Sequence, residues 1–140
     1  MRISSRSFQA KRNLKGIGID LVAVPRIKNL LKEHPRKSCE RILTREEIRY
    51  WQKKKYSPLI YSKFFAAKEA FFKAFEGHGL GLEGWRLMEI EMRPRQIFHA
   101  KLSKRKTNRN WQAKGKFFAM KECIGAQVIL WEKENALAAS

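Results

Sequence analysis

The segment from Ser57 to Phe75 constrains the fold of this chain more than any other. It begins with Ser57-Pro58, a helix N-cap followed by a proline that suits the first helical turn. Apolar side chains then recur at helical spacing, at Ile60, Phe64, Ala67, Phe71 and Phe75. The pattern is broken by a group of glycines, Gly77, Gly79, Gly81 and Gly84. The sequence therefore predicts one long helix that ends at about residue 75 or 76.

Beyond these glycines the apolar period changes from helical to strand-like. Four strands are predicted there, over residues 86–92, 96–102, 111–118 and 124–131. A further strand precedes the helix over residues 16–24, an apolar run in which Asp20 is the only charge. Strands joined by short turns favour an antiparallel sheet. We therefore predict an α+β fold in which an antiparallel sheet packs against the long helix.

Two shorter helices are predicted between the first strand and the long helix. Pro25 fits the first turn of one of them, and Pro35 ends it. Thr44 and Glu47 have the spacing of a capping box, which predicts the start of the second. The expected order is one strand, three helices and then the remaining strands.

The length of 140 residues and the hydrophobic fraction of 44% suit a single core. We expect one domain over residues 15–133, a basic arm over 1–14 and a tail over 134–140. The arm lacks the apolar core of a secretory signal, and no apolar run approaches the roughly 18 residues of a membrane span. The two cysteines, Cys39 and Cys123, match neither a zinc site nor a disulfide framework. These features favour a reducing, cytoplasmic location.

The formal net charge of +18 predicts attraction to polyanions at long range. RNA, DNA, an acidic membrane face, an acidic protein and a multiply phosphorylated small molecule all satisfy that condition. Solubility alone would also account for a basic composition. Charge therefore sets a class of partners without choosing among them.

Two carboxylates and a lysine form the candidate catalytic group, Asp20, Glu69 and Lys73. Glu69 and Lys73 are four residues apart, so their side chains share one face of the long helix. Lys68 lies about 100° around the same helix and could flank the group. With Asp20 at the end of a neighbouring strand, the two carboxylates could hold one Mg²⁺, which takes oxygen ligands and leaves room for phosphates.

The glycines that follow the helix, Gly77, Gly79 and Gly81, would let the backbone approach a ligand closely. Each of these features also has an ordinary structural explanation. A Glu–Lys pair at this spacing is commonly a surface salt bridge, and a glycine group commonly ends a helix. The functional interpretation therefore depends on the features occurring together.

Two segments resemble the signatures of the holo-acyl-carrier-protein synthase family of 4′-phosphopantetheinyl transferases. Residues 16–27, GIGIDLVAVPRI, resemble the first signature, and residues 64–75, FFAAKEAFFKAF, resemble the second. Residues 44–47, TREE, resemble the segment that leads into the second motif. The order of the motifs, their separation and the chain length also agree with the family. The resemblance extends from Gly16 to about Gly81 and is weak afterwards.

The resemblance implies a Mg²⁺-dependent step of fatty acid biosynthesis with coenzyme A as donor. In that reaction a serine hydroxyl of apo acyl carrier protein attacks the β-phosphate of coenzyme A, and adenosine 3′,5′-bisphosphate leaves. By resemblance, Asp20 and Glu69 bind the metal, and Lys73 lies near the diphosphate to stabilise charge or assist proton transfer. Lys68 and the glycines described above belong to the coenzyme A site by the same resemblance. The family also implies a homotrimer with coenzyme A between subunits.

The acidic carrier protein gives the net charge a specific interpretation. Arg26 matches an arginine that the family uses to dock the carrier. Basic residues near it on the first two predicted helices extend this docking face to Lys28, Lys32, Arg45 and Arg49. Complementary charge of this kind mainly accelerates encounter.

The family's third motif, a His-Val-Ser-Ile-Ser-His-like stretch, has no counterpart here. Residues 113–120 read AKGKFFAM and contain no histidine. Lys114 and Lys116 are the candidate replacements for its phosphate contacts, whereas His78 and His99 do not align with it. A homologue that binds coenzyme A or carrier protein without efficient turnover is therefore an alternative.

A basic nucleic-acid-binding protein is a second and less favoured alternative. Basic residues interleave with aromatic ones in the C-terminal third, at Arg105, Lys106, Arg109, Trp111, Lys114, Lys116, Phe117 and Phe118. Such a pattern can hold a phosphate backbone and stack bases. However, the chain contains no recognised nucleic-acid-binding motif.

Overall fold

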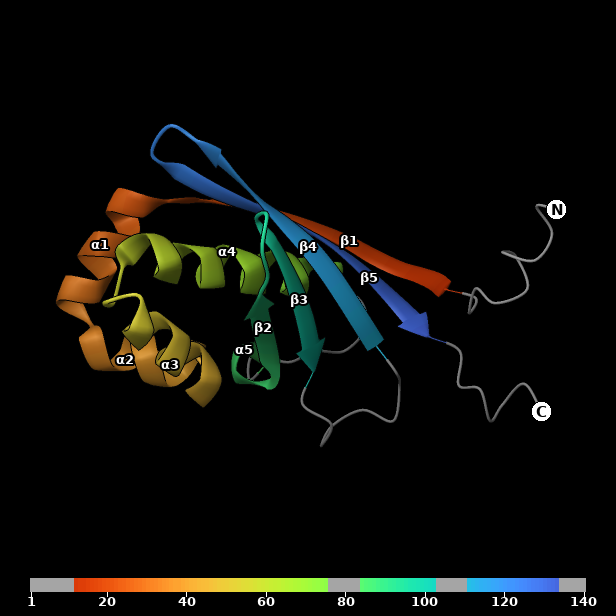
Figure 1. Ribbon diagram of the computed structural model, residues 1–140, viewed down its shortest axis with the longest axis horizontal. Coiled ribbons are helices and arrows are strands. Elements are labelled where there is room, and N and C mark those ends of the chain that lie inside the picture. Colours follow the sequence, from red (N-terminus) through yellow and green to blue (C-terminus); the bar gives the residue numbers. More distant parts are fainter. Residues whose placement is uncertain (1–11, 76–83, 103–110, 134–140) are drawn as a thin grey trace, which may run out of the picture.

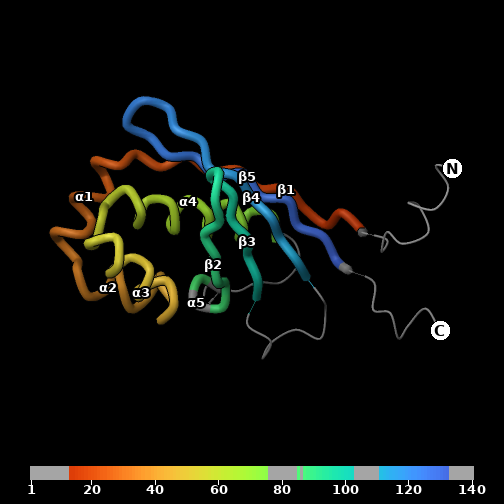
Figure 2. Tube along the Cα trace, in the orientation of Figure 1, coloured from red at the N-terminus to blue at the C-terminus, as the bar shows by residue number. Residues whose placement is uncertain are grey.

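One long helix crosses one face of a five-stranded antiparallel sheet (Figure 1). The computed structural model describes residues 12–75, 84–102 and 111–133. The elements in chain order are β1 (Arg12–Ala23), α1 (Val24–Glu33), α2 (Pro35–Ile42), α3 (Arg45–Lys53), α4 (Pro58–Ala74), α5 (Gly84–Leu87), β2 (Met88–Met92), β3 (Ile97–Leu102), β4 (Trp111–Met120) and β5 (Cys123–Lys133). The strand order β1-β5-β4-β3-β2 places the first and last strands side by side (Figure 2). The predicted α+β fold with a sheet packed on a long helix is confirmed.

Strand β1 packs on α4 through two glycines. A Cβ atom on Gly16 would overlap the carbonyl oxygen of Ala74, and one on Gly18 would overlap that of Ala70. The two backbones therefore approach more closely than any larger side chain would allow. Because side chains alternate along a strand, Asp20 shares the helix-facing side with these glycines and with buried Val22. The strand thus brings a carboxylate to the last turns of the helix.

The core lies between α4 and the inner face of the sheet. Tyr61, Phe64 and Phe71 of α4 are almost fully buried, as are Phe98 of β3 and Leu130 of β5. The helix begins as predicted, because Ser57 accepts a hydrogen bond from the backbone N–H of Ile60 and Pro58 occupies the first turn. It ends at Ala74, also close to the predicted position.

The short helices differ from the prediction at Pro35. That residue was expected only to end a helix, but it also begins α2, one residue after α1 ends at Glu33. A proline lacks an N–H group, and the first turn of a helix does not need one. The predicted capping box at α3 is confirmed, since Thr44 and Glu47 each accept from the other's backbone N–H. With α5 before β2, the described residues contain five helices where three were expected.

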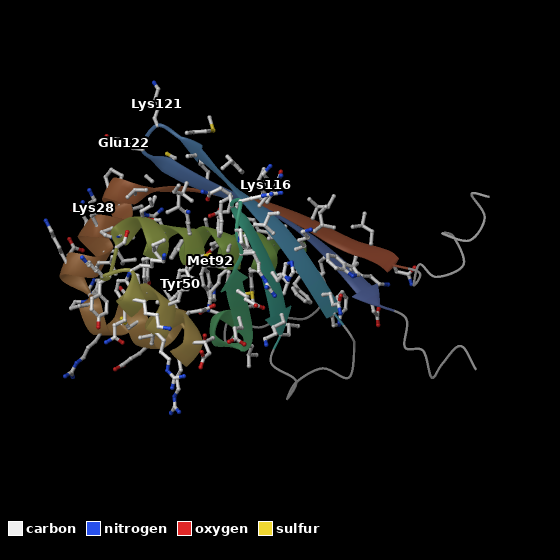
Figure 3. The ribbon with its side chains drawn as sticks, viewed as in Figure 1. Lys28, Tyr50, Met92, Lys116, Lys121 and Glu122 are labelled. Atoms are coloured by element: carbon white, nitrogen blue, oxygen red, sulfur yellow. The ribbon has the colours of Figure 1, made fainter. Side chains whose placement is uncertain are left out.

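Strand β1 begins earlier than predicted, and the turn between β4 and β5 contacts the first helix. β1 begins at Arg12, inside the segment expected to be a basic arm. Lys121 and Glu122 form the turn between β4 and β5 (Figure 3). This turn contacts the start of α1, where the Val24 N–H donates to the Glu122 carbonyl oxygen at 2.9 Å. None of the helices in the described residues has the length and hydropathy needed to cross a membrane.

Candidate active site

The last turns of α4 and strand β1 meet at an ion pair. Lys73 Nζ donates to Asp20 Oδ1 at 2.9 Å and to the Ile19 carbonyl oxygen at 3.3 Å. The Asp20 side chain is 15% exposed, whereas that of Lys73 is 47% exposed. The carboxylate is therefore set into the protein while the ammonium stays accessible to solvent. A residue from the start of the chain and one from its middle form this pair because the two glycines of β1 let α4 lie against the strand.

Glu69 lies one helical turn before Lys73 and is half-buried. Burial raises the pKa of the Glu69 carboxyl, and the negative charge of Asp20 raises it further. The positive charge of Lys73 acts on that pKa in the opposite direction. All three predicted catalytic residues are therefore close enough to interact electrostatically, as their positions on β1 and α4 predicted.

The chemistry of this cluster fits a magnesium ion. Mg²⁺ takes oxygen ligands, and it commonly binds one or two carboxylates together with waters and substrate phosphates. The negative charge of Asp20, which helps raise the pKa of the Glu69 carboxyl, would also favour a divalent cation beside it. Within residues 12–75, 84–102 and 111–133, no group of three His, Cys, Asp or Glu side chains forms a larger metal site. Asp20 and Glu69 are the two carboxylates of this cluster that could hold the ion.

Lys68 is directed elsewhere, contrary to the expectation that it flanks this cluster. Its side chain is fully buried and forms an ion pair with fully buried Glu47, with 2.6 Å between Lys68 Nζ and Glu47 Oε1. The same ammonium donates to the carbonyl oxygens of Ile42 and Trp85. The sequence contains a signal for this, because Lys68 falls on the apolar stripe of α4, four residues after Phe64 and three before Phe71. Lys68 is therefore an interior residue and is not exposed to a ligand.

Sequence reasoning assigned Glu47 only to the capping box. In the structure its Oε1 accepts from the Thr44 N–H at 2.8 Å, and its Oε2 accepts from the Ile90 N–H at 2.7 Å. One carboxylate thus caps α3, accepts from the middle residue of β2 and neutralises Lys68. No local pattern predicts the contacts to β2 and α4, since both are distant in sequence.

The remaining predicted site residues fall into two groups. Gly77, Gly79 and Gly81 lie outside the described residues. The predicted carrier-docking residues are all exposed, Arg26 and Lys28 on α1 and Arg45 and Arg49 on α3. Figure 1 shows α1, α2 and α3 grouped around one end of α4. Arg49 forms an exposed ion pair with Glu46 at 2.7 Å, so part of its charge is already compensated.

The candidate replacements for the third motif lie on the other face of the sheet. Ala113, Gly115 and Phe117 of β4 face the core, so Lys114 and Lys116 project from the face away from α4. Lys116 is labelled on β4 in Figure 3. Within one chain these lysines are therefore separated by the sheet from the cluster at Asp20. The same register places exposed His99 of β3 directly opposite Lys114.

Most of the aromatic side chains that the nucleic-acid alternative requires are buried in this structure. Trp111 is 8% exposed and Phe117 is 3% exposed, so neither ring is available to stack on a base. Residues 103–110, which contain three of the basic residues of that hypothesis, lie outside the described residues. Trp111 and Phe117 belong to the core, whereas Phe118 is half-buried and lies outside it.

A family model described as the 4′-phosphopantetheinyl transferase superfamily matches residues 16–127 of this chain. Among curated relatives, the holo-[acyl-carrier-protein] synthase of Clostridium botulinum strain Alaska E43 is 40% identical over 79 residues, which are 56% of this chain and 61% of that protein. The synthase of Koribacter versatilis is 39% identical over 93 residues, covering 61% of this chain and 72% of that protein. The chain spans about three fifths of the length of the first relatives it matches, at 60–61%.

Two solved structures extend the similarity over nearly their whole length. Holo-[acyl-carrier-protein] synthase of Helicobacter pylori, in complex with coenzyme A, is 30% identical with a TM-score of 0.68, covering 81% of this chain and 98% of that chain. The synthase of Bacillus anthracis, in complex with CoA (3′,5′-ADP), is 30% identical with a TM-score of 0.65, covering 89% of this chain and all of that chain.

Proposed function

Because this chain belongs to the 4′-phosphopantetheinyl transferase superfamily, we propose that it transfers 4′-phosphopantetheine from coenzyme A to a serine of an apo acyl carrier protein. The observation that carries the proposal is the cluster of Asp20, Glu69 and Lys73 at the junction of β1 and α4. Its support from relatives is that the two solved synthases described above are complexes with coenzyme A or its adenosine bisphosphate part.

The residues of the cluster have distinct roles in this reaction. Asp20 and Glu69 would hold Mg²⁺, which supplies positive charge for the diphosphate of coenzyme A. Lys73 can exchange Asp20 for a phosphate oxygen, because its ammonium is half-exposed. The serine hydroxyl releases its proton to solvent as its oxygen bonds to the β-phosphorus, the bond from that phosphorus to the bridging oxygen breaks, and adenosine 3′,5′-bisphosphate leaves with the bridging oxygen. Positioning and charge neutralisation dominate such transfers, and those are the tasks these three side chains perform.

The carrier protein is the proposed macromolecular partner. The exposed cations Arg26 and Lys28 of α1 and Arg45 and Arg49 of α3 would attract an acidic surface. The proposed reaction also requires a compartment that contains coenzyme A and the carrier. We place the protein in the cytoplasm, where the unpaired thiols of Cys39 and Cys123 remain reduced.

The outer face of the sheet supports self-association. Leu14, Ile17, Ile19 and Leu21 of β1 are 63%, 66%, 58% and 52% exposed, and Ile129 of β5 is 51% exposed. A continuous apolar surface of this kind marks an interaction site. We infer a homo-oligomer, a trimer by resemblance to the family, in which this face is covered by other copies. Sedimentation equilibrium measures the stoichiometry, and a monomer at micromolar concentration would contradict this inference.

Mass spectrometry of a carrier protein tests the activity directly. Apo acyl carrier protein, coenzyme A, Mg²⁺ and this protein should give a carrier heavier by about 340 Da, the mass of one phosphopantetheine on the nucleophilic serine. EDTA should prevent the gain. The absence of the third-motif histidine favours one competing function, a homologue that binds without turnover. No gain with several carriers, despite binding of coenzyme A, would support that alternative.

A further inference from the structure

A fully buried ion pair lies directly behind the candidate active site. Lys68 precedes Glu69 in α4, and both Lys68 and its partner Glu47 have no exposed side-chain area. Removing two charges from water costs several kcal/mol per ion, so an interior ion pair is weak evidence for a stabilising role. Replacement by apolar side chains is often neutral or stabilising. The position of this pair, one residue from a candidate metal ligand, indicates what it contributes instead.

The pair connects α4 to four other elements. Lys68 Nζ donates to the carbonyl oxygen of Ile42, the last residue of α2, and to that of Trp85 in α5 at 2.9 Å. Glu47 lies in α3, and its second oxygen accepts from the Ile90 N–H of β2. The three N–H groups of the ammonium thus have three acceptors, Glu47, Ile42 and Trp85.

This fixed direction determines where the next residue points. Successive residues of a helix are about 100° apart, so an immobilised Lys68 sets the angle of Glu69 and, one turn later, of Lys73. A rotation of α4 by about 20° would move a group at about 6 Å from the helix axis by about 2 Å. A displacement of that size would separate Glu69 and Lys73 from Asp20, and misplacements of about 1 Å can reduce a reaction rate 100-fold.

We propose that Glu47 and Lys68 are positioning residues, which fix the rotation of α4 so that Glu69 and Lys73 face Asp20 across β1. The glycines of β1 set the distance between the strand and the helix, and the buried pair sets the angle. The proposal rests on the proposed function for its catalytic consequence. Its consequence for metal binding requires only that Asp20 and Glu69 share an ion.

The double variant Glu47→Leu/Lys68→Met tests this role, because it removes both charges without leaving either one buried alone. Tyr61→Phe is the matched control, since it removes a buried hydrogen bond of the same helix, from the Tyr61 hydroxyl to the Ser38 carbonyl at 2.9 Å. For both variants we would measure the melting temperature, Mn²⁺ affinity by electron paramagnetic resonance with coenzyme A present, and kcat for carrier modification. Glu47→Gln/Lys68→Met replaces the double variant if that one does not fold, because the amide oxygen can still accept from the Ile90 N–H.

We expect the double variant to lose about tenfold in Mn²⁺ affinity and about tenfold or more in kcat, the range for residues that support metal ligands. Tyr61→Phe should keep wild-type values of both at a similar melting temperature. A double variant with wild-type Mn²⁺ affinity and kcat would overturn the proposal. Wild-type protein that modifies no carrier would contradict the proposed function alone, because the Mn²⁺ comparison among the variants would still decide the positioning role.

Discussion

Helix α4 carries two lysine–carboxylate pairs that differ in almost every physical respect. Lys68 and Glu47 are wholly buried and 2.6 Å apart, with every polar atom of the pair near a backbone partner. Lys73 and Asp20 are 2.9 Å apart, but Lys73 is 47% exposed and Asp20 keeps contact with solvent. The two lysines are five residues apart on one helix, and they differ because Lys68 falls on the apolar stripe of α4 whereas Lys73 does not.

The buried pair has a structural role, whereas the exposed pair is suited to chemistry. A buried, fully bonded pair cannot accept a ligand without losing contacts that connect α4 to four other elements. An exposed pair contributes little to stability, since water screens it, and either partner can be exchanged for a phosphate or a cation. Chemistry is therefore feasible at the exposed pair of Lys73 and Asp20. The buried pair of Lys68 and Glu47 determines how the residues of that site are oriented.

Loss of the candidate metal ligand Glu69, beside the exposed pair, should have the largest effect on activity. Glu69→Gln keeps the size of the side chain but removes the charge that would bind Mg²⁺, so we expect carrier modification to fall by about 10³-fold. The half-buried position of Glu69 should leave the fold unchanged, and circular dichroism and the melting temperature provide that control. Transfer at the wild-type rate by Glu69→Gln would remove this residue from the mechanism.

Breaking the two pairs one at a time should lower the unfolding free energy by very different amounts. Lys68→Met leaves the Glu47 carboxylate buried without its partner, which costs about 3–5 kcal/mol of unfolding free energy. Lys73→Met opens an exposed pair and should cost about 1 kcal/mol or less. Urea denaturation followed by fluorescence measures both. Equal losses in the two variants would mean that the buried and the exposed ion pair contribute equally to stability, contrary to this prediction.

The sequence predicts the parts of the fold that depend on local pattern. The cap at Ser57, the apolar period of α4 and the alternation of the later strands are each visible within a few residues, and each is present in the structure. The grouping of Asp20, Glu69 and Lys73 was also predicted, from the motif resemblance and the four-residue spacing of Glu69 and Lys73, but the ion pair between Asp20 and Lys73 was not. Pro35 was ambiguous, because the same residue can end one helix and begin the next.

Contacts between distant segments were not predictable by the same reasoning. Lys68 was expected beside Glu69 at the ligand, but the angular offset between neighbouring helix residues turns it into the interior toward Glu47. The role of Ile90 as a donor to Glu47 depends on the position of β2, which no local pattern specifies. The face of β4 that carries Lys114 follows from strand alternation only once the register with β5 is known.

A smaller effect, on the pKa of Glu69, would show directly that the carboxylates of Glu69 and Asp20 interact. That pKa is raised by burial and then by the charge of Asp20, so Asp20→Asn should lower it toward its ordinary value while burial keeps part of the shift. Because the folded chain binds this proton more tightly than the unfolded chain, the unfolding free energy decreases as the pH rises from 4.5 through the raised pKa, and Asp20→Asn should reduce that decrease.

Carbon-13 NMR of the Glu69 carboxyl in metal-free protein measures the titration. Glu46→Gln, which removes an exposed carboxylate paired with Arg49, should leave the Glu69 pKa unchanged. An Asp20→Asn variant with the wild-type Glu69 pKa would show that the two carboxylates do not interact, and it would remove the electrostatic basis for a shared cation.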